Sequence, residues 1–397
     1  MAEKLTEIEL SGIQLHDTQP RVLKDPSYNI LQANTYLGDL LERSSKEDDI
    51  ETPYGLIHVA VQGDRSKPAI LTYHDIGMNH VTCFQGFFNY SEMQPILRHF
   101  CVYHVNAPGQ QEGAVPLTQS DGAKRDEKAS LLTDASKTTR SESVDKGDPS
   151  SHHWSGYPTM DQLAEMLVPV LQFYNIRAII GFGVGAGANI LSRLALAHPD
   201  RVDALFLINP TAGVTGWSEW AYQKLNTWYL KGGNITAFTE GYLLWHWFGK
   251  DTKDRNHDLV QVYKENIKAI NPHNLAMFID SYINRTDLGI IRNTDPLRKV
   301  KSLKCNIMLV AGTGSPHLDD SVNMYGRLDP VNSNWMKISD CGGMALEEQP
   351  TKVCEAFRLF LQGMGHVPAL SQSKYVAART AAHQEPLLDD PIRTASC

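Results

Sequence analysis

The chain has 397 residues, of which 42% are hydrophobic and 21% charged, and its formal net charge is −8. This is ordinary globular usage, and the acidic balance without a dense Lys/Arg run excludes the basic surface that binding to nucleic acid requires. No apolar stretch approaches the roughly 20 residues of a membrane span, and no apolar signal region opens the chain, so we expect a cytoplasmic protein. The six cysteines are widely spaced and form no C-x-x-C pair, so the sequence predicts no metal site and no cofactor.

Organised structure is expected from residue 49, after a polar arm at residues 1–48. Short apolar runs bounded by turn residues alternate with segments of helical periodicity, which predicts a mostly parallel sheet flanked by helices, the α/β class. The expected strands lie at residues 50–52, 56–61, 68–74, 100–105, 177–180, 204–208, 306–311 and 335–338, and the expected helices at 84–98, 160–173, 186–197 and 351–362.

Residues 212–290 interrupt this alternation, because they contain helical patterns only and are rich in tryptophan and tyrosine. A helical block inserted between two strands is expected to form a cap over the carboxyl ends of the sheet. The helices within it are expected at residues 218–230, 237–248, 258–270 and 275–284.

Two polar segments are expected to be disordered, because they cannot bury enough apolar surface to offset the entropy of ordering. The first, residues 120–153, is interpreted as an insertion in the domain at residues 49–366; the second is a tail at residues 367–397. Each holds one serine with arginine three residues before it, Ser143 and Ser396, which are candidate phosphorylation sites.

Three segments resemble characteristic turns of an α/β-hydrolase: H-D-I-G at residues 74–77, N-A-P-G at 106–109, and G-F-G-V-G-A-G at 181–187. The last lies where a hydrolase has its G-x-S-x-G nucleophile turn. The catalytic side chains are missing from the matching positions. Gly183 stands at the expected nucleophile, Gly343 at the base and Thr313 at the acid, so we expect no catalytic residue and no enzyme activity.

A more specific resemblance rests on longer stretches in the same order. These are P-A-I-L-T-Y-H-D-I-G-M-N-H at residues 68–80, N-A-P-G-Q-Q-E-G at 106–113, Y-P-T-M-D-Q-L-A-E-M-L at 157–167, G-V-G-A-G-A at 183–188, R-T-D-L at 285–288 and F-L-Q-G-M-G at 360–365. Together they resemble the N-myc downstream-regulated (NDRG) family over residues 49–366.

The resemblance implies an α/β-hydrolase fold without hydrolase activity. It further implies a cytosolic scaffold in stress response, differentiation, signalling and vesicle traffic, with other proteins as partners and peripheral membrane association left open. The chain departs from the family at Asn106, where an aspartate is usual, at Thr313, where an aspartate follows glycine, and in the lengthened segment at residues 120–153.

Two other functions stay open at this point. The pattern G-x-G-x-x-A at residues 181–186 fits a dinucleotide fingerprint, although the following strand ends without an acidic residue to hold a ribose. His74 and Asp75 could act as an acid/base pair in a residual hydrolase. Our hypothesis is that His74, Asp75, Gly183, Val184 and the cap aromatics bound a relict pocket, either narrowed or reused for binding.

Overall fold

The computed structural model describes residues 46–117, 156–292 and 300–366. Within them an eight-stranded sheet has the order β1-β2-β4-β3-β5-β6-β7-β8. The first strands pair antiparallel, β1 with β2 and β2 with β4, and all other neighbours are parallel. The strands are β1 (Lys46–Thr52), β2 (Gly55–Gln62), β3 (Ala69–Tyr73), β4 (Cys101–Asn106), β5 (Ile179–Val184), β6 (Val202–Ile208), β7 (Asn306–Gly312) and β8 (Ser333–Ile338).

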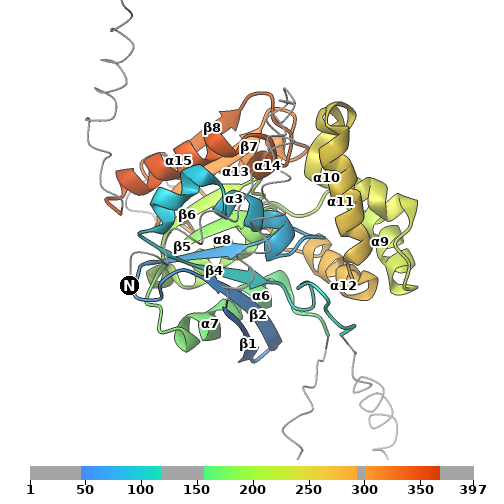
Figure 1. Cartoon of the computed structure of the whole chain (residues 1–397), viewed down its shortest axis with the longest axis horizontal. Coiled ribbons are helices and arrows are strands. Elements are labelled where there is room, and N and C mark those ends of the chain that lie inside the picture. Colours follow the sequence, from blue (N-terminus) through green and yellow to red (C-terminus); the bar gives the residue numbers. More distant parts are fainter. Residues whose placement is uncertain (1–45, 118–155, 293–299, 367–397) are drawn as a thin grey trace, which may run out of the picture.

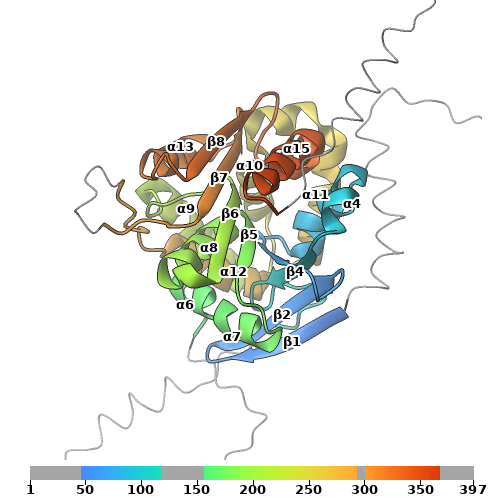
Figure 2. The ribbon, with the colours of Figure 1, turned by 90° about the vertical axis from the view of Figure 1, so that its left-hand side faces the viewer.

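Helices cover both faces of this sheet, as Figure 2 shows. One face carries α6 (Met160–Glu165), α7 (Leu167–Phe173), α8 (Ala186–Ala197) and α13 (Leu318–Gly326). The opposite face carries α15 (Pro350–Gly363), α14 (Ala345–Glu348) and a series of short turns: η1 (Val81–Gln85), α3 (Gly86–Phe88), η2 (Ser91–Met93) and α4 (Gln94–Leu97). The central strands β3, β4 and β5 are buried along their whole length, which is why their sequences are nearly continuous apolar runs.

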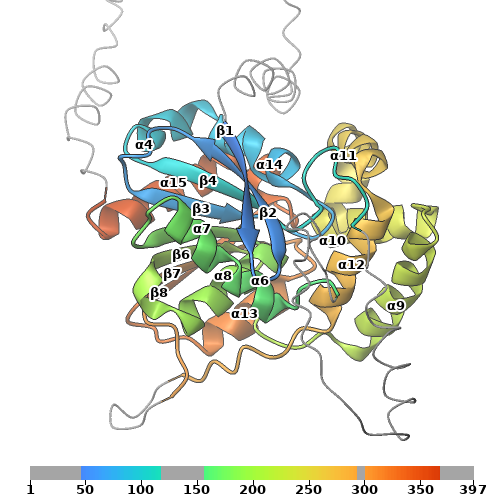
Figure 3. The same ribbon diagram turned by 90° about the horizontal axis from the view of Figure 1, so that it is seen from below.

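A block of four helices lies between β6 and β7 in the chain and at one end of the sheet in space (Figures 1 and 3). These are α9 (Trp217–Lys231), α10 (Ala237–Arg255), α11 (His257–Ala269) and α12 (Pro272–Ile283). They fall within residues 212–290, where the sequence predicted a helical cap. Helix α10 is interrupted at Gly249, whose φ of 72° and ψ of −174° are not helical, so its first segment ends at the expected residue 248 and a second helical segment continues to Arg255.

Other boundaries differ from the sequence expectation for physical reasons. Strand β1 begins at Lys46, earlier than expected, because residues 46–48 already pair with residues 59–61 of β2. The helix expected at 160–173 is divided at Met166, since Pro169 has no N–H to continue the helical ladder. The helix expected at 84–98 is a chain of short turns. Helix α13 was not predicted.

Several sequence calls lie outside the described residues. They include most of the arm at 1–48, all of the segment at 120–153, the tail at 367–397 and both candidate phosphorylation serines, Ser143 and Ser396. In the part of the chain that is described, no helix is long and apolar enough to cross a membrane.

Candidate relict active site

The turn between β5 and α8 has the strained backbone that a hydrolase uses to present its nucleophile. The strained residue is Gly185, with φ 52° and ψ −113°. The sequence pattern placed this position at Gly183, and the structure corrects the assignment by two residues. Gly183 lies inside β5, where a Cβ would come within 2.7 Å of the Ala188 Cα, so it is the glycine that lets α8 approach the strand.

The space beside Gly185 is occupied by the carboxylate of Asp75. A Cβ added at Gly185 would lie 2.2 Å from that carboxylate, so neither serine nor any other nucleophilic residue fits there without displacing it. The elbow therefore lacks a side chain, and the volume a nucleophile would use holds the carboxylate of another residue.

The same carboxylate occupies the oxyanion hole. Asp75 Oδ1 accepts hydrogen bonds from the backbone N–H of Ile76, at 2.8 Å, and of Ala186, at 2.9 Å. In α/β-hydrolases the oxyanion donors are the N–H of the residue after the nucleophile and an N–H from the loop after the third strand, and Ala186 and Ile76 stand at these positions. Both donors are thus satisfied within the protein and are not available to a substrate.

The second carboxylate oxygen contacts the cap. Asp75 Oδ2 lies 3.0 Å from His246 Nε2 on α10, and His246 Nδ1 lies 3.3 Å from the Tyr242 hydroxyl. Asp75 and His246 are 4% and 1% exposed. Burial alone would raise the pKa of the Asp75 carboxyl, but His246 and the Ala186 N–H hold that pKa below its ordinary value. Asp75 is thus a buried anion held by hydrogen bonds from three sides.

His74 is tied to the backbone through both ring nitrogens. Its Nδ1 donates to the Asp75 carbonyl at 2.7 Å, and its Nε2 accepts from the Ala107 N–H at 2.9 Å. Burial lowers the pKa of His74 to about 4, so the ring is neutral at pH 7. With both nitrogens engaged, His74 connects the loops after β3 and β4 and has no nitrogen left to accept a substrate proton or bind a metal.

The expected base position, Gly343, likewise has no room for a side chain. A Cβ at Gly343 would lie 2.2 Å from the Trp247 carbonyl oxygen, and the Gly343 carbonyl accepts from Asn209 Nδ2 at 2.7 Å. Backbone of the cap therefore occupies the place of a catalytic histidine side chain. The expected acid position, Thr313, is exposed and donates its N–H to the Ile338 carbonyl at 2.8 Å.

Sequence reasoning missed two buried histidines that the fold brings to this site, His246 and His317. Their ring centroids are 4.4 Å apart, and His317 Nε2 lies 3.1 Å from the His246 carbonyl oxygen. Burial and the nearby His246 lower the pKa of His317 to about 3. One sequence signal was available for a buried His246, namely that this polar residue lies within the apolar run of α10.

Asn106, at the position where the resemblance implies an aspartate, forms a neutral pair with His80. The Asn106 Oδ1 accepts from the His80 N–H at 2.7 Å, and Asn106 Nδ2 donates to His80 Nδ1 at 2.9 Å. Burial lowers the pKa of His80 to about 4, which suits an uncharged amide partner. Nowhere in the described ranges do three His, Cys, Asp or Glu side chains gather as metal ligands.

The sheet order, the elbow and the cap define the α/β-hydrolase fold, and solved structures agree. A thermophilic esterase from Thermogutta terrifontis superposes with a TM-score of 0.58 at 16% identity, covering 80% of this chain and 98% of that one. Carboxylesterase CesB from Bacillus subtilis gives 0.55 at 16% identity, covering 85% and 98%. At this identity the likeness shows the fold alone.

The family is shown by closer relatives. The sequence model of the Ndr family matches residues 47–124 and 145–368, so the chain belongs to the Ndr family. It is 40% identical to NDRG1 of Xenopus tropicalis over 346 residues, 86% of this chain and 77% of that protein. It is 36% identical to NDRG4-B of Xenopus laevis over 392 residues, 98% and 95% of the two chains. The interruption of the family match, residues 125–144, lies within the segment that the sequence predicted as an insertion.

Proposed function

We propose that this protein is a non-enzymatic α/β-hydrolase-like scaffold that acts through contacts with other proteins. The observation that carries the proposal is the Asp75 carboxylate, which fills the oxyanion hole beside an elbow glycine. A hydrolase stabilises the negative charge of its transition state at this place, whereas a carboxylate there repels it. The burial of His74, Asp75 and Val184 supports a relict pocket that has been narrowed.

The outer face of α9 supports binding to other proteins. On this helix the polar side chains of Gln223, Asn226 and Thr227 are buried, whereas large aromatic and aliphatic side chains face outward. The exposed ones are Trp217 (82%), Trp228 (68%), Leu225 (48%), Tyr222 (42%), Trp220 (39%) and Tyr229 (38%). Tryptophan and tyrosine are enriched at the centres of protein interfaces, and a large exposed apolar patch is unusual on a soluble monomer.

The cellular setting is part of the same proposal and rests on family membership. It comprises stress response, differentiation, signalling and vesicle traffic in the cytoplasm, with peripheral membrane association and tail phosphorylation at Ser396 as further elements. Ser143 is the corresponding candidate in the segment at 120–153.

Capture of partners from a cytosolic extract tests the scaffold. We expect proteins bound by the full chain to be lost when Trp217 and Trp228 are both changed to serine. Val331→Ser is the matched control, because Val331 is 90% exposed and lies outside the cap. A second variant lacking residues 120–153 shows whether that segment contributes. The scaffold proposal fails if no protein is captured above background, or if the double variant and the control retain the same partners.

One observation favours a second candidate, a residual hydrolase. A carboxylate beside an imidazole can act as a nucleophile or as an acid/base pair, and Asp75 lies 3.0 Å from His246. In this alternative His74 and Asp75 would carry the chemistry. It is the weaker candidate because His74 has both nitrogens bonded to backbone, and both Asp75 oxygens already have donors.

A further inference from the structure

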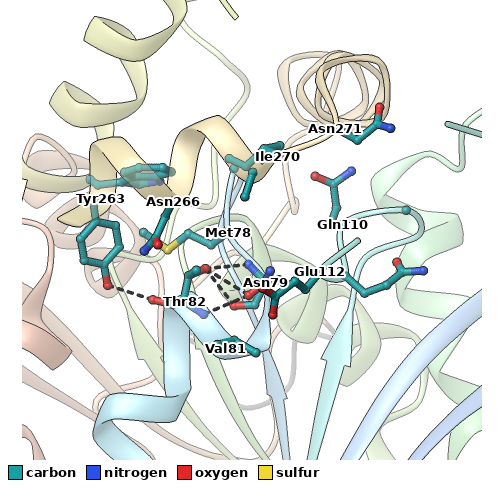
Figure 4. A pocket seen from close by; sticks show the side chains of 15 residues that line it. Met78, Asn79, Val81, Thr82, Gln110, Glu112, Tyr263, Asn266, Ile270 and Asn271 are labelled. Atoms are coloured by element: carbon teal, nitrogen blue, oxygen red, sulfur yellow. Dashed lines mark hydrogen bonds between the residues drawn. The ribbon is translucent and has the colours of Figure 1, made fainter. Parts of the chain in front are cut away.

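The cavity drawn in Figure 4 lies between helix α11 of the cap and the loops that follow β3 and β4, and its volume is about 110 Å³. Hydrogen bonds among its lining residues join the two parts of the molecule. The Tyr263 hydroxyl donates to the Thr82 carbonyl at 2.8 Å, and the Thr82 N–H donates to Asn79 Oδ1 at 2.9 Å. This space belongs to the contact between cap and sheet domain. A larger cavity of about 390 Å³ lies between α9 and α10 and has a different lining.

The larger cavity is lined by two pairs of residues from facing helices. Glu219 and Tyr222 come from α9, Tyr242 and Trp245 come from α10, and Gly241 completes the lining. The members of each pair are three residues apart and so lie on the same face of their helix. The ring centroids of Tyr222 and Tyr242 are 5.8 Å apart, and those of Tyr242 and Trp245 are 6.0 Å apart. Three neighbouring aromatic rings therefore form the wall of this cavity.

Contacts behind the rings hold this wall in place. Tyr222 stacks on Phe238, with ring centroids 4.2 Å apart. Tyr242 is buried, and its hydroxyl donates to Glu219 Oε1 at 3.5 Å and lies 3.3 Å from His246 Nδ1. Tyr222 and Trp245 are about half exposed, so the cavity is open to solvent. The site is therefore preformed and accessible, as small-molecule sites usually are.

Gly241 keeps the cavity open. It lies inside α10, where glycine is less stable than alanine because it has more conformational freedom to lose on folding. No neighbouring element requires a glycine here, since a Cβ added at Gly241 would meet no atom within 4 Å, in contrast to Gly183 in β5. The absent side chain thus has an effect on the cavity and none on helix packing.

The charge of the lining favours a cation. Glu219 is the only charged residue among the described residues that line the cavity, and no Lys, Arg or His is among them. Within the part of the chain that the structure describes, no ion pair engages the Glu219 carboxylate. The faces of aromatic rings also carry negative potential. The carboxylate and the three rings therefore attract a cation and repel an anion.

The hydrogen-bonding groups restrict the kind of cation. A primary ammonium is strongly hydrated and carries three N–H donors, whereas the main acceptor here is the Glu219 carboxylate, one oxygen of which already accepts from Tyr242. A quaternary ammonium donates no hydrogen bond and binds through the attraction of its charge to aromatic faces. A phosphate attached to it would meet the Glu219 carboxylate and no cation.

The volume of about 390 Å³ is the share of about thirteen water molecules in the liquid, which leaves room for a whole small cation. We propose that Glu219, Tyr222, Tyr242 and Trp245 form a binding site for a small quaternary ammonium compound without a phosphate group, of the size of choline. The proposal does not depend on whether the protein acts as a scaffold, because Trp217 and Trp228, which test the scaffold, do not line this cavity.

The test is a titration of the full chain followed by saturation-transfer difference NMR. The two probes are choline and its neutral analogue, an alcohol in which a tert-butyl group replaces the trimethylammonium group at the same shape. We expect choline to bind with a dissociation constant lower by about fivefold or more, because only choline carries the charge. The proposal is overturned if choline does not bind, or if the neutral analogue binds as tightly.

Two further ligands test the assignment to a free small cation. Phosphocholine should bind more weakly than choline, because its phosphate meets the Glu219 carboxylate without a cation to offset it. A peptide that carries trimethyllysine represents a methylated protein partner and should bind no more tightly than choline. Tighter binding of either ligand would contradict the assignment.

Two variants locate the binding. Glu219→Gln keeps the shape of the side chain without its charge and should weaken choline binding about fivefold or more while leaving the neutral analogue unaffected. Gly241→Leu places a side chain in the open space without displacing a neighbour, so it should abolish choline binding in a folded protein. Glu92→Gln, at an exposed glutamate outside the cap, is the matched control and should bind as the parent does. Thermal unfolding by circular dichroism verifies each fold. Undiminished choline binding by Gly241→Leu contradicts the proposal even if Glu219→Gln does not fold.

Discussion

The buried Asp75 carboxylate should make a large contribution to stability, and two substitutions measure it. Asp75→Ala leaves three buried donors without an acceptor: the N–H groups of Ile76 and Ala186 and the Nε2–H of His246. Each unsatisfied buried donor costs about 1–3 kcal/mol. Allowing for water entering the vacated space, we expect a loss of about 3–5 kcal/mol in the free energy of unfolding.

Asp75→Asn separates the hydrogen bonds from the charge. The amide oxygen still accepts from Ile76 and Ala186, and the amide N–H faces His246, which can accept it by changing tautomer because Tyr242 can bond either form of the other ring nitrogen. We expect a loss of only about 1 kcal/mol for this variant.

Urea denaturation at pH 7, followed by far-ultraviolet circular dichroism, gives both values. Asp254→Ala is the control, because Asp254 is exposed on the same cap helix as His246 and should change stability by no more than about 0.5 kcal/mol. The reasoning is refuted if Asp75→Ala costs no more than Asp75→Asn, or if neither differs from the control.

Two further predictions follow from the shifted pKa values. Asn106→Asp places a carboxylate beside the His80 ring and should raise the pKa of His80 from about 4 by roughly 1–3 units. NMR titration of the imidazole measures this change, and an unchanged pKa would contradict the pairing. Burial lowers the pKa values of His74 (to about 4) and His317 (to about 3), so as the pH drops these histidines bind protons in the unfolded chain before they do in the folded one. The free energy of unfolding should therefore fall between pH 6.5 and 4, by up to about 3 kcal/mol per histidine. Burial raises the pKa of Glu347 to about 7, so protonation of Glu347 stabilises the folded chain as the pH falls and offsets the loss from one histidine. Urea titrations in which the free energy of unfolding rises as the pH falls over this range would contradict the prediction.

The fold could be predicted from the sequence because apolar strands alternate with amphipathic helices, and the family motifs occur in order. The position of the elbow could not be fixed. The run of glycines at 181–187 fits G-x-x-x-G in two registers, centred on Gly183 or on Gly185. Only the backbone angles distinguish them, because Gly185 alone in this run has a left-handed φ.

The hydrogen-bond partners of Asp75 could not be predicted from the sequence either. His246 is 171 residues away and lies in a helix whose apolar pattern predicts burial but not the contact. The sequence did place Asp75 in the H-D-I-G segment that resembles a hydrolase turn. It did not indicate that the carboxylate would enter the oxyanion hole and bond to both donors, because that depends on the side-chain conformation of Asp75 and on the missing Cβ of Gly185.

The most direct test of the central claim is ester hydrolysis by the purified chain, measured with p-nitrophenyl acetate and butyrate and compared with His246→Ala. If Asp75 and His246 serve structure alone, both proteins should release nitrophenol at the rate of an equal concentration of a non-enzymatic protein. Saturable turnover by the wild type that His246→Ala abolishes, while its melting temperature shows that the variant is folded, would contradict the account.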